Sequence, residues 1–293
     1  MSEDPFHRHR RLLFTVAYEM LGSAADAEDV VQETWLRWSN VDHDEVREPR
    51  AYLVRIATRL SLNRLRTRAR RREEYVGEWL PEPLLTTPDV AGDVELAEHV
   101  SIAMLTVLET LAPIERAVFV LREVFDTPYD EIARIVDKTS AAVRQIAHRA
   151  REHVAARRPR MEVTTSEQQR VVERFVAAVR HGDVDGLLAV LAPDIVLVSD
   201  GGGIVQAAPR PIEGAEQVAR FLVAVQGGRQ FVARPVLING APGIRIEVAG
   251  ALDTAMSFTI EGGRITGLYA IRNPNKLAWL DDAAQLARDG APG

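Results

Sequence analysis

The chain has 293 residues, of which 46% are hydrophobic and 27% are charged, and its formal net charge is −6 at pH 7. This length suits two or three domains, and the composition is that of an ordinary globular protein. The chain contains no cysteine, which excludes disulfides, thiolate catalysis and cysteine-based metal sites, and its seven histidines lack metal-site spacing, so neither a metal nor a cofactor is expected.

The hydropathy pattern indicates a cytoplasmic protein. The N-terminal stretch MSEDPFHRHRR is not followed by the apolar run of a signal peptide. No window approaches the roughly 18 uninterrupted apolar residues of a membrane-spanning helix.

Basic charge is concentrated in two short runs, although the chain as a whole is acidic. Residues 64–72 read RLRTRARRR, with six arginines in nine residues, and residues 134–160 hold eight Lys or Arg against two Asp or Glu. Phosphate contacts need local charge rather than a basic total. One such run is equally typical of a solvated helix face, but two of them favour contact with nucleic acid.

Helical periodicity extends through residues 6–75. The first helix is predicted to end at Gly22, and Ser23 is placed to cap a second amphipathic helix over residues 24–38. A third long helix, which a proline opens, is predicted over residues 49–72.

A proline-rich stretch separates these helices from a second helical segment. Residues 76–93 contain three prolines and are typical of a linker, although they also carry apolar side chains that a solvated linker does not need. Residues 94–158 are again helical, and residues 159–166 form a second short linker.

Residues 128–151 have the pattern of a helix-turn-helix. Pro128 begins one helix, residues 137–139 form the turn, and Ser140 is predicted to cap a second helix that ends at Arg151. Arginine and glutamine side chains make bidentate contacts to base edges. The outer face of the second helix carries Arg144, Gln145, His148 and Arg149. Other helical hairpins share this pattern, so alone it is only suggestive of DNA binding.

From residue 167 onward the pattern changes to mixed helix and strand. Two helices are followed by strand-like runs at residues 195–199, 229–238, 243–252, 255–263 and 264–273, with a helix over 214–225. This order predicts an α+β domain in which a curved antiparallel sheet wraps around helices. The last stretch, from residue 277, is predicted as a short amphipathic helix or a tail.

The helical half of the chain resembles the two conserved domains of an extracytoplasmic-function (ECF) sigma factor of the sigma-70 family. The resemblance rests on DAEDVVQETWLRW (26–38), EPRAYLVRIATRLSLNRLR (48–66) and the segment from LETL through the helix-turn-helix (108–152). It implies a promoter-specificity subunit of bacterial RNA polymerase, with core polymerase and promoter DNA as its partners.

The resemblance also assigns roles by position. It implies a core-polymerase-binding face of Asp29, Gln32, Glu33, Trp35 and Leu36. It implies contacts to the −10 element from Arg55, Arg59, Asn63, Arg64 and Arg66. It implies contacts to the −35 element from Ser140, Arg144, Gln145, His148 and Arg149. The 39–50 loop matches the segment that captures a flipped −10 base, but here the loop is markedly acidic.

The C-terminal half resembles the SnoaL-like fold, which is related to ketosteroid isomerase. Three motifs, WLPEPL (79–84), DGGG (200–203) and NPNKL (273–277), resemble those of the SigJ-like ECF sigma factors, which carry such a domain. In those proteins the second and third motifs are usually DGGGK and NPDKL, so Ile204 and Asn275 depart from the pattern and remove a charge each. The three motifs are predicted to meet in an interdomain regulatory contact, and their residues are Trp79, Leu80, Pro81, Glu82, Pro83 and Leu84; Asp200, Gly201, Gly202 and Gly203; and Asn273, Pro274, Asn275, Lys276 and Leu277.

The sequence therefore predicts a multidomain protein in which two all-α sigma domains precede an α+β SnoaL-like cone domain. The predicted parts are region 2 (1–75), a linker (76–93), region 4 (94–158), a linker (159–166), the SnoaL-like domain (167–277) and a tail (278–293). Intramolecular contact between the sigma domains and the SnoaL-like domain is expected to modulate transcription initiation.

Two other functions are compatible with parts of the pattern. One is a helix-turn-helix regulator with a small-molecule-binding C-terminal domain, but such a protein has no use for the polymerase-binding face of residues 26–38. The other is an isomerase or cyclase, for which the candidate acids and bases are His181, Asp194, Asp200 and Asp253. These form no recognisable dyad, so no catalytic residue is predicted.

Overall fold

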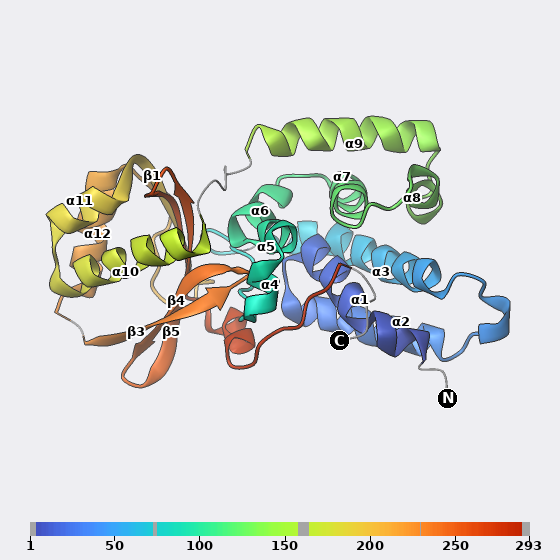
Figure 1. The fold of residues 1–293 in the computed structure, drawn as a ribbon, viewed down its shortest axis with the longest axis horizontal. Helices are drawn as coiled ribbons and strands as arrows, with labels where there is room; N and C mark the ends of the chain where they lie inside the picture. The colour runs from blue at the N-terminus through green and yellow to red at the C-terminus, as the bar shows by residue number, and fades with distance from the viewer. Residues whose placement is uncertain (1–3, 73–74, 158–163, 229, 289–293) are drawn as a thin grey trace. The chain divides into compact units, whose positions relative to one another are not determined.

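The computed structural model divides into two compact units, whose elements are labelled in Figure 1. It describes residues 4–72, 75–157, 164–228 and 230–288. Unit 1 comprises residues 1–74, 105–158 and 285–293, and unit 2 comprises residues 75–104 and 159–284. Residues 94–104, which were predicted to belong to region 4, thus belong to the same unit as the predicted SnoaL-like domain. No helix in the described ranges is long and apolar enough to cross a membrane.

The first part of unit 1 consists of the helices α1 (Pro5–Leu21), α2 (Ala24–Trp38) and α3 (Pro49–Arg72), with a short 3-10 turn, η1 (His43–Glu45). As predicted, Gly22 ends α1 and Ser23 caps α2. Gly22 adopts a left-handed φ of 61°, and the Ser23 hydroxyl accepts a hydrogen bond from the Asp26 amide at 3.2 Å. The apolar faces of the helices pack together and bury Leu12, Leu13, Val16, Val30 and Leu53.

The second part of unit 1 follows α6 (Ile102–Leu108), the helix in which the chain passes between the units. It comprises α7 (Pro113–Phe119), a π-helical turn η2 (Val120–Val124), α8 (Tyr129–Val136) and α9 (Ser140–Ala155). α8 and α9 are the predicted helix-turn-helix, and Val143, Ala147, Ala150 and Val154 form the buried side of α9.

The predicted cap of α9 needs a correction. Thr139, not Ser140, is the capping residue, because Thr139 has the extended backbone that a cap requires and its hydroxyl accepts from the Ala142 amide at 3.2 Å. Ser140 is the first helical residue, and its hydroxyl donates to the Asp130 carboxylate at 2.5 Å.

A buried arginine joins the two parts of unit 1. Arg116 of α7 donates two hydrogen bonds to the Glu19 carbonyl oxygen of α1, at 2.9 and 2.7 Å, and pairs with the Glu109 carboxylate at 2.6 Å. The Glu19 carboxyl is itself fully buried, and neither of its oxygens has a hydrogen-bond partner among the residues that the structure describes. Burial raises the pKa of Glu19 to about 8, against the opposing influence of Arg116.

Unit 2 contains a six-stranded sheet in the order β2-β1-β6-β5-β4-β3. The strands are β1 (Leu191–Asp200), β2 (Ile212–Glu213), β3 (Phe231–Ile238), β4 (Ala241–Val248), β5 (Ala251–Glu261) and β6 (Arg264–Ile271). The helix and strand order agrees with the predicted α+β class. The predicted antiparallel arrangement holds for four of the five strand pairs, and the exception is β1, which pairs with β6 in parallel.

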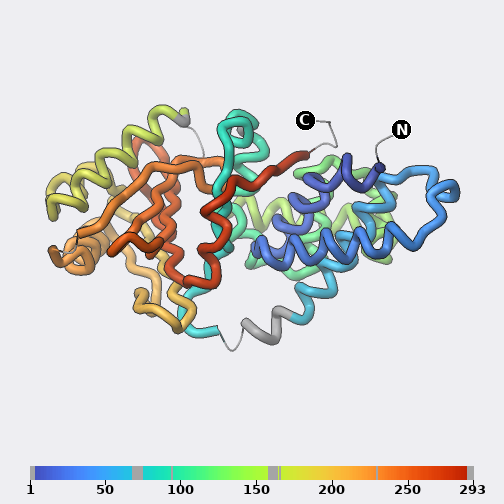
Figure 2. Tube along the Cα trace, turned by 90° about the horizontal axis from the view of Figure 1, so that it is seen from below, coloured from blue at the N-terminus to red at the C-terminus, as the bar shows by residue number. Residues whose placement is uncertain are grey.

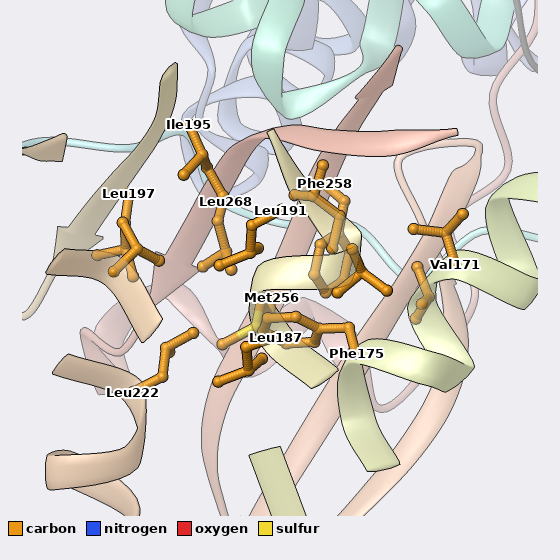
Figure 3. Close-up of a cluster of buried hydrophobic side chains, with 14 of the residues drawn as sticks. Val171, Phe175, Leu187, Leu191, Ile195, Leu197, Leu222, Met256, Phe258 and Leu268 are labelled. Carbon is orange, nitrogen blue, oxygen red and sulfur yellow. The ribbon is translucent and has the colours of Figure 1, made fainter. Parts of the chain in front are cut away.

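One face of this sheet is covered by α10 (Thr165–His181), α11 (Val184–Val190) and α12 (Ala215–Gln226) (Figure 1). The core between them is apolar, and Figure 3 shows the side chains of helices and strands pointing toward one another. Phe175 and Phe258 meet edge to face, with ring centroids 5.3 Å apart. The core also contains Leu187, Leu191, Ile195, Leu197, Leu222, Met256 and Leu268.

The other face of the sheet is covered by the stretch predicted as a linker. A second buried cluster joins Leu80 and Ile102 to Ile238, Ala255, Ile271, Leu277 and Leu280. Figure 2 traces residues 75–104 in cyan beside the orange and red strands. This segment contains the short helices α4 (Pro88–Gly92) and α5 (Val94–Val100). The apolar side chains of the linker are therefore part of a core.

The end of the chain is not an amphipathic helix over its described length. The sheet is followed by the 3-10 turns η3 (Pro274–Lys276) and η4 (Ala278–Leu280), and residues 281–288 are irregular. Leu286 is buried, and the Ala287 amide donates to the Thr15 hydroxyl of α1 at 3.1 Å.

Candidate functional site

The predicted polymerase-binding residues share one face of α2. Asp29, Gln32 and Leu36 are exposed, and Glu33 and Trp35 are half-buried. Residues three and four positions apart lie on the same side of a helix, so this spacing forms a continuous stripe. Leu36 is 61% exposed and gives this polar stripe an apolar contact point. The stripe is suited to a protein partner.

The predicted −10-contacting residues of α3 have different environments. Asn63 and Arg66 are exposed, and the Arg55 guanidinium lies 5.1 Å from the centre of the Tyr52 ring. Arg64 donates to the Asp26 carbonyl oxygen at 2.6 Å and lies on the α2 side. Arg59 donates to carbonyl oxygens of α8. The arginine run continues beyond these residues, but its side chains from residue 68 onward lie outside the described part.

The 39–50 loop contains an aromatic stack. The His43 ring lies on the Trp38 ring with centroids 4.1 Å apart and an interplanar angle of 12°. The Trp38 indole N–H donates to the Asp4 carboxylate at 3.0 Å, and this hydrogen bond fixes the orientation of the Trp38 ring. Beside the loop lies a groove of about 490 Å³, lined by residues of the loop, α3 and α8.

The predicted −35-contacting residues form the exposed side of α9. Arg144, Gln145, His148 and Arg149 are all exposed, whereas Ser140 is half-buried. Arg144 also lies 5.4 Å from the Tyr129 ring, a contact compatible with its guanidinium remaining at the surface. Donor side chains therefore lie opposite the buried side of the helix, as a major-groove helix requires.

The predicted regulatory motifs meet within unit 2 around Asp200. The Asp200 carboxylate is completely buried and accepts hydrogen bonds from the Tyr75 hydroxyl at 2.7 Å and from the Leu80 amide at 2.8 Å. The buried Lys276 ammonium lies 2.7 Å from the same carboxylate and donates to the Leu80 carbonyl oxygen at 2.6 Å. One ion pair thus binds both backbone groups of a single linker residue. We call this arrangement the Asp200 cluster.

Aromatic rings complete the Asp200 cluster. The Lys276 ammonium lies 4.0 Å from the centre of the Trp79 ring and 4.9 Å from that of Tyr75. The Asn273 amide donates to the Tyr75 hydroxyl at 2.9 Å. Burial, together with the hydrogen bond to Asp200, raises the pKa of Tyr75, so the phenol stays neutral and donates.

Two positions of the DGGG motif require glycine for steric and backbone reasons. Gly202 has a φ of 61°, and a Cβ there would lie 2.2 Å from the Asn273 amide nitrogen. Gly203 has a φ of 70°, and its Cβ would lie 3.0 Å from Val76. Ile204 and Asn275 are the two residues that differ from the usual motifs. Ile204 is 57% exposed, and Asn275 is also exposed. The loss of a charge at each of these two surface positions therefore leaves the buried Asp200–Lys276 ion pair intact.

A second set of contacts holds the linker further along. The Leu84 amide donates to the buried Asn239 side chain at 2.8 Å, and Asn239 donates in turn to the Val100 carbonyl oxygen at 2.7 Å. The Gly240 amide donates to the Thr86 hydroxyl at 2.9 Å. None of Tyr75, Thr86 and Asn239 was predicted as a site residue. The only available signal was Asn-Gly at 239–240, which is typical of a tight turn between strands.

The candidate acids and bases lie outside the apolar core of unit 2. Asp194 and His181 are exposed, and Asp253 pairs with Arg272 at 2.9 Å. The Asp200 carboxylate accepts a hydrogen bond from the linker residue Leu80. In the described part of the chain, the core cluster consists of apolar side chains, and no group of three or more potential metal ligands was found. Within the described residues, the four candidates therefore form no acid–base pair with one another.

Comparison with known proteins assigns each part of the chain to a family. Residues 6–71 match Sigma-70 region 2, residues 101–154 match Sigma-70 region 4, and residues 172–268 match the SnoaL-like domain. The ECF RNA polymerase sigma factor SigJ of Mycobacterium tuberculosis is 36% identical, over 94% of this chain and 93% of its own. A probable ECF RNA polymerase sigma factor, SigI, of the same species is 32% identical over 92% of each.

A solved structure has the same fold over most of the chain. The crystal structure of the M. tuberculosis extracytoplasmic function sigma factor SigJ superposes with a TM-score of 0.73 at 34% identity. It covers 92% of this chain and 95% of that one.

Proposed function

The chain belongs to the ECF sigma factors of RNA polymerase, and from that premise we propose how its surfaces divide the work of promoter recognition. Core polymerase binds the α2 stripe around Leu36. The −10 element binds α3 and the 39–50 loop, and the −35 element binds the exposed side of α9. Loss of any one surface then affects initiation differently, because the first acts on polymerase and the others on DNA.

The SnoaL-like domain acts as a regulator in cis rather than as an enzyme. The observation that carries this proposal is the buried Asp200–Lys276 pair, which binds both the amide and the carbonyl of Leu80. The linker between regions 2 and 4 is thereby part of the folded C-terminal unit. Its attachment is intramolecular, so the domain acts at a high effective concentration without a separate partner. Because the polymerase is its target, the protein works in the cytoplasm.

In-vitro transcription with purified core polymerase tests this proposal. The template is a genomic library whose transcript starts are sequenced, and the full-length protein is compared with Asp200→Asn and Lys276→Met. Specific starts with a shared −35/−10 pair are expected from the full-length protein. A changed start rate at the same promoters in both variants supports regulation through the linker, and an unchanged rate in both contradicts it.

A catalytic role is tested separately. Asp194→Asn and Asp253→Asn remove the two candidate catalytic acids that lie outside the linker contact. Unchanged transcription in both variants, with no conversion of a small-molecule substrate by the parent protein, is the expected result. Loss of transcription in Asp194→Asn, whose side chain is exposed, would point instead to chemistry in this domain.

A further inference from the structure

One basic side chain on the exposed side of α9 has surroundings that the others do not share. Three of the others lie within 4.0 Å of a carboxylate, in the pairs His148–Glu152, Arg149–Glu115 and Arg151–Glu123. Among the residues that the structure describes, Arg144 has no carboxylate within that distance. Its guanidinium lies instead 5.4 Å from the centre of the ring of Tyr129, the first residue of α8.

The Tyr129 ring is held by a second guanidinium. Arg122 of η2 lies 4.9 Å from the ring centre. Its Nη1 atom pairs with the Asp126 carboxylate at 2.8 Å and donates to the Thr127 carbonyl oxygen at 3.2 Å. The charge of Arg122 is therefore already paired within its own turn. The half-buried Tyr129 ring packs against this fixed group, whereas Arg144 is exposed.

The beginnings of α8 and α9 are joined at one more point. The Ser140 hydroxyl, at the first residue of α9, donates to the Asp130 carboxylate at 2.5 Å. Asp130 follows Tyr129 in α8, and Arg144 lies about one turn after Ser140 in α9. This hydrogen bond therefore sets the place at which Arg144 meets the ring.

Contact with a ring leaves the hydrogen-bond donors of Arg144 available. A carboxylate accepts hydrogen bonds from the N–H groups of an arginine, whereas the face of an aromatic ring attracts the charge without occupying those groups. An arginine fork can donate to both O6 and N7 of a guanine in the major groove. The amino-terminal part of a recognition helix reaches the base edges, and Arg144 lies in that part of α9. A side chain that is already oriented loses less conformational freedom when it binds.

We propose that Tyr129 is a positioning residue that holds the Arg144 guanidinium ready to read one guanine of the −35 element. The inference rests on the proposed role of α9 in binding that element. Tyr129 acts through Arg144 and not by contact with a base. It therefore contributes to selectivity at a single base pair and leaves the selectivity at the other positions unchanged.

Transcription from a promoter library tests this positioning role. The full-length protein and core polymerase initiate on templates whose −35 element is randomised, and transcript counts give the preference for each base at each position. Arg144→Ala is expected to lower the preference for guanine at one position at least about tenfold, through the loss of one bidentate contact. Tyr129→Leu is expected to lower it about two- to fivefold at the same position, through the loss of an exposed cation–π contact. Tyr129→Phe keeps the ring and is expected to keep the preference.

The positions of the −35 element that Arg144 does not read are the internal control. An unchanged guanine preference in Tyr129→Leu overturns the positioning role. A loss spread evenly over all positions also overturns it, because that pattern marks a distorted helix-turn-helix. The double variant is expected to match Arg144→Ala, since Tyr129 acts only through that side chain. If Arg144→Ala alters no position, the proposed reading role of Arg144 fails, and the inference falls with it.

A measurement without DNA checks the contact itself. The arginine side-chain N–H signals of the free full-length protein are recorded by NMR, and the signal that disappears in Arg144→Lys identifies Arg144. This signal is expected to move in Tyr129→Leu, because the ring current is lost, and to stay in place in Tyr129→Phe. Lys138→Met, in the exposed turn before α9, is the control and is expected to leave it unchanged. A signal that does not move in Tyr129→Leu overturns the proposal, even if that variant fails to initiate.

Discussion

Replacing Lys276 by methionine removes one half of the buried ion pair while keeping most of the side-chain volume. The Asp200 carboxylate then keeps its donors from the Tyr75 hydroxyl and from the Leu80 and Gly202 amides, but it loses its counter-charge. Removing one partner of a buried pair costs about 3–5 kcal/mol. Because three hydrogen-bond donors to Asp200 remain, the expected loss of unfolding free energy lies at the lower end of this range, about 3 kcal/mol.

The expected effect is measurable by differential scanning calorimetry. For a unit of this size, a loss of about 1 kcal/mol in unfolding free energy lowers the Tm by roughly 2–4 °C. The Tm of unit 2 is therefore expected to fall by roughly 6–12 °C. Asp200→Asn is expected to cost a similar amount, because it leaves the buried ammonium without a carboxylate. The double variant is expected to lose less than the sum of the two, since no unpaired charge remains.

The control for this prediction is Arg220→Met. Arg220 pairs with Glu216 at 3.2 Å on the surface of α12, with both side chains more than 70% exposed. Surface substitutions of this kind change stability by at most about 0.5 kcal/mol. If Lys276→Met shifts the transition no further than the control, or if the two single effects simply add, the buried pair does not hold the linker as argued.

Three further predictions concern other parts of the chain. Leu36→Glu places a charge in the exposed stripe and is expected to weaken binding to core polymerase at least tenfold in a fluorescence anisotropy titration, with an unchanged circular dichroism spectrum. Gly202→Ala is expected to destabilise unit 2 by about 1–2 kcal/mol more than Gly262→Ala, because both backbones are left-handed but only the first Cβ meets a side chain, that of Asn273. Glu19 binds its proton up to about pH 8 in the folded protein but only up to about pH 4.5 when unfolded, so wild-type stability is expected to fall by about 1.4 kcal/mol per pH unit between those values. Glu19→Gln removes that slope, and melting curves from pH 5 to pH 9 compare the two.

The helices of unit 1 were predictable because burial repeats along each of them. Val143, Ala147, Ala150 and Val154 follow helical spacing, and the charged residues of α9 occupy the remaining positions. The cap was placed one residue late because Thr139 and Ser140 both carry a hydroxyl. Only the extended backbone of Thr139 distinguishes them.

Pairings between distant segments were not predictable in the same way. The parallel pairing of Val196 with Gly267 joins strands far apart in the chain, and each strand has the same alternating pattern whichever neighbour it takes. The contact of Arg59 with α8 has the same origin. Periodicity places an arginine on the outside of its own helix, but it does not say what another helix places opposite.

The Asp200 cluster was predictable as a meeting of three motifs but not as an ion pair. The sequence indicated that WLPEPL, DGGG and NPNKL come together, on the basis of a family resemblance. It did not indicate that Lys276 is the buried cation, or that Tyr75 outside the three motifs donates to Asp200. Burial of a lysine depends on a cavity that several elements build together.

The attachment of the linker to the sheet has a consequence for promoter architecture. A free chain of roughly 30 residues has a root-mean-square span of about 30 Å and can stretch to about 100 Å, so it tolerates many distances between its ends. The segment from Tyr75 to Met104 is instead hydrogen-bonded into a folded unit, which gives its two ends a fixed separation. The linker then acts as a ruler. A sigma factor built this way is therefore expected to initiate best at promoters with one particular number of base pairs between their two elements, and transcript counts from templates that differ only in this spacing check the expectation.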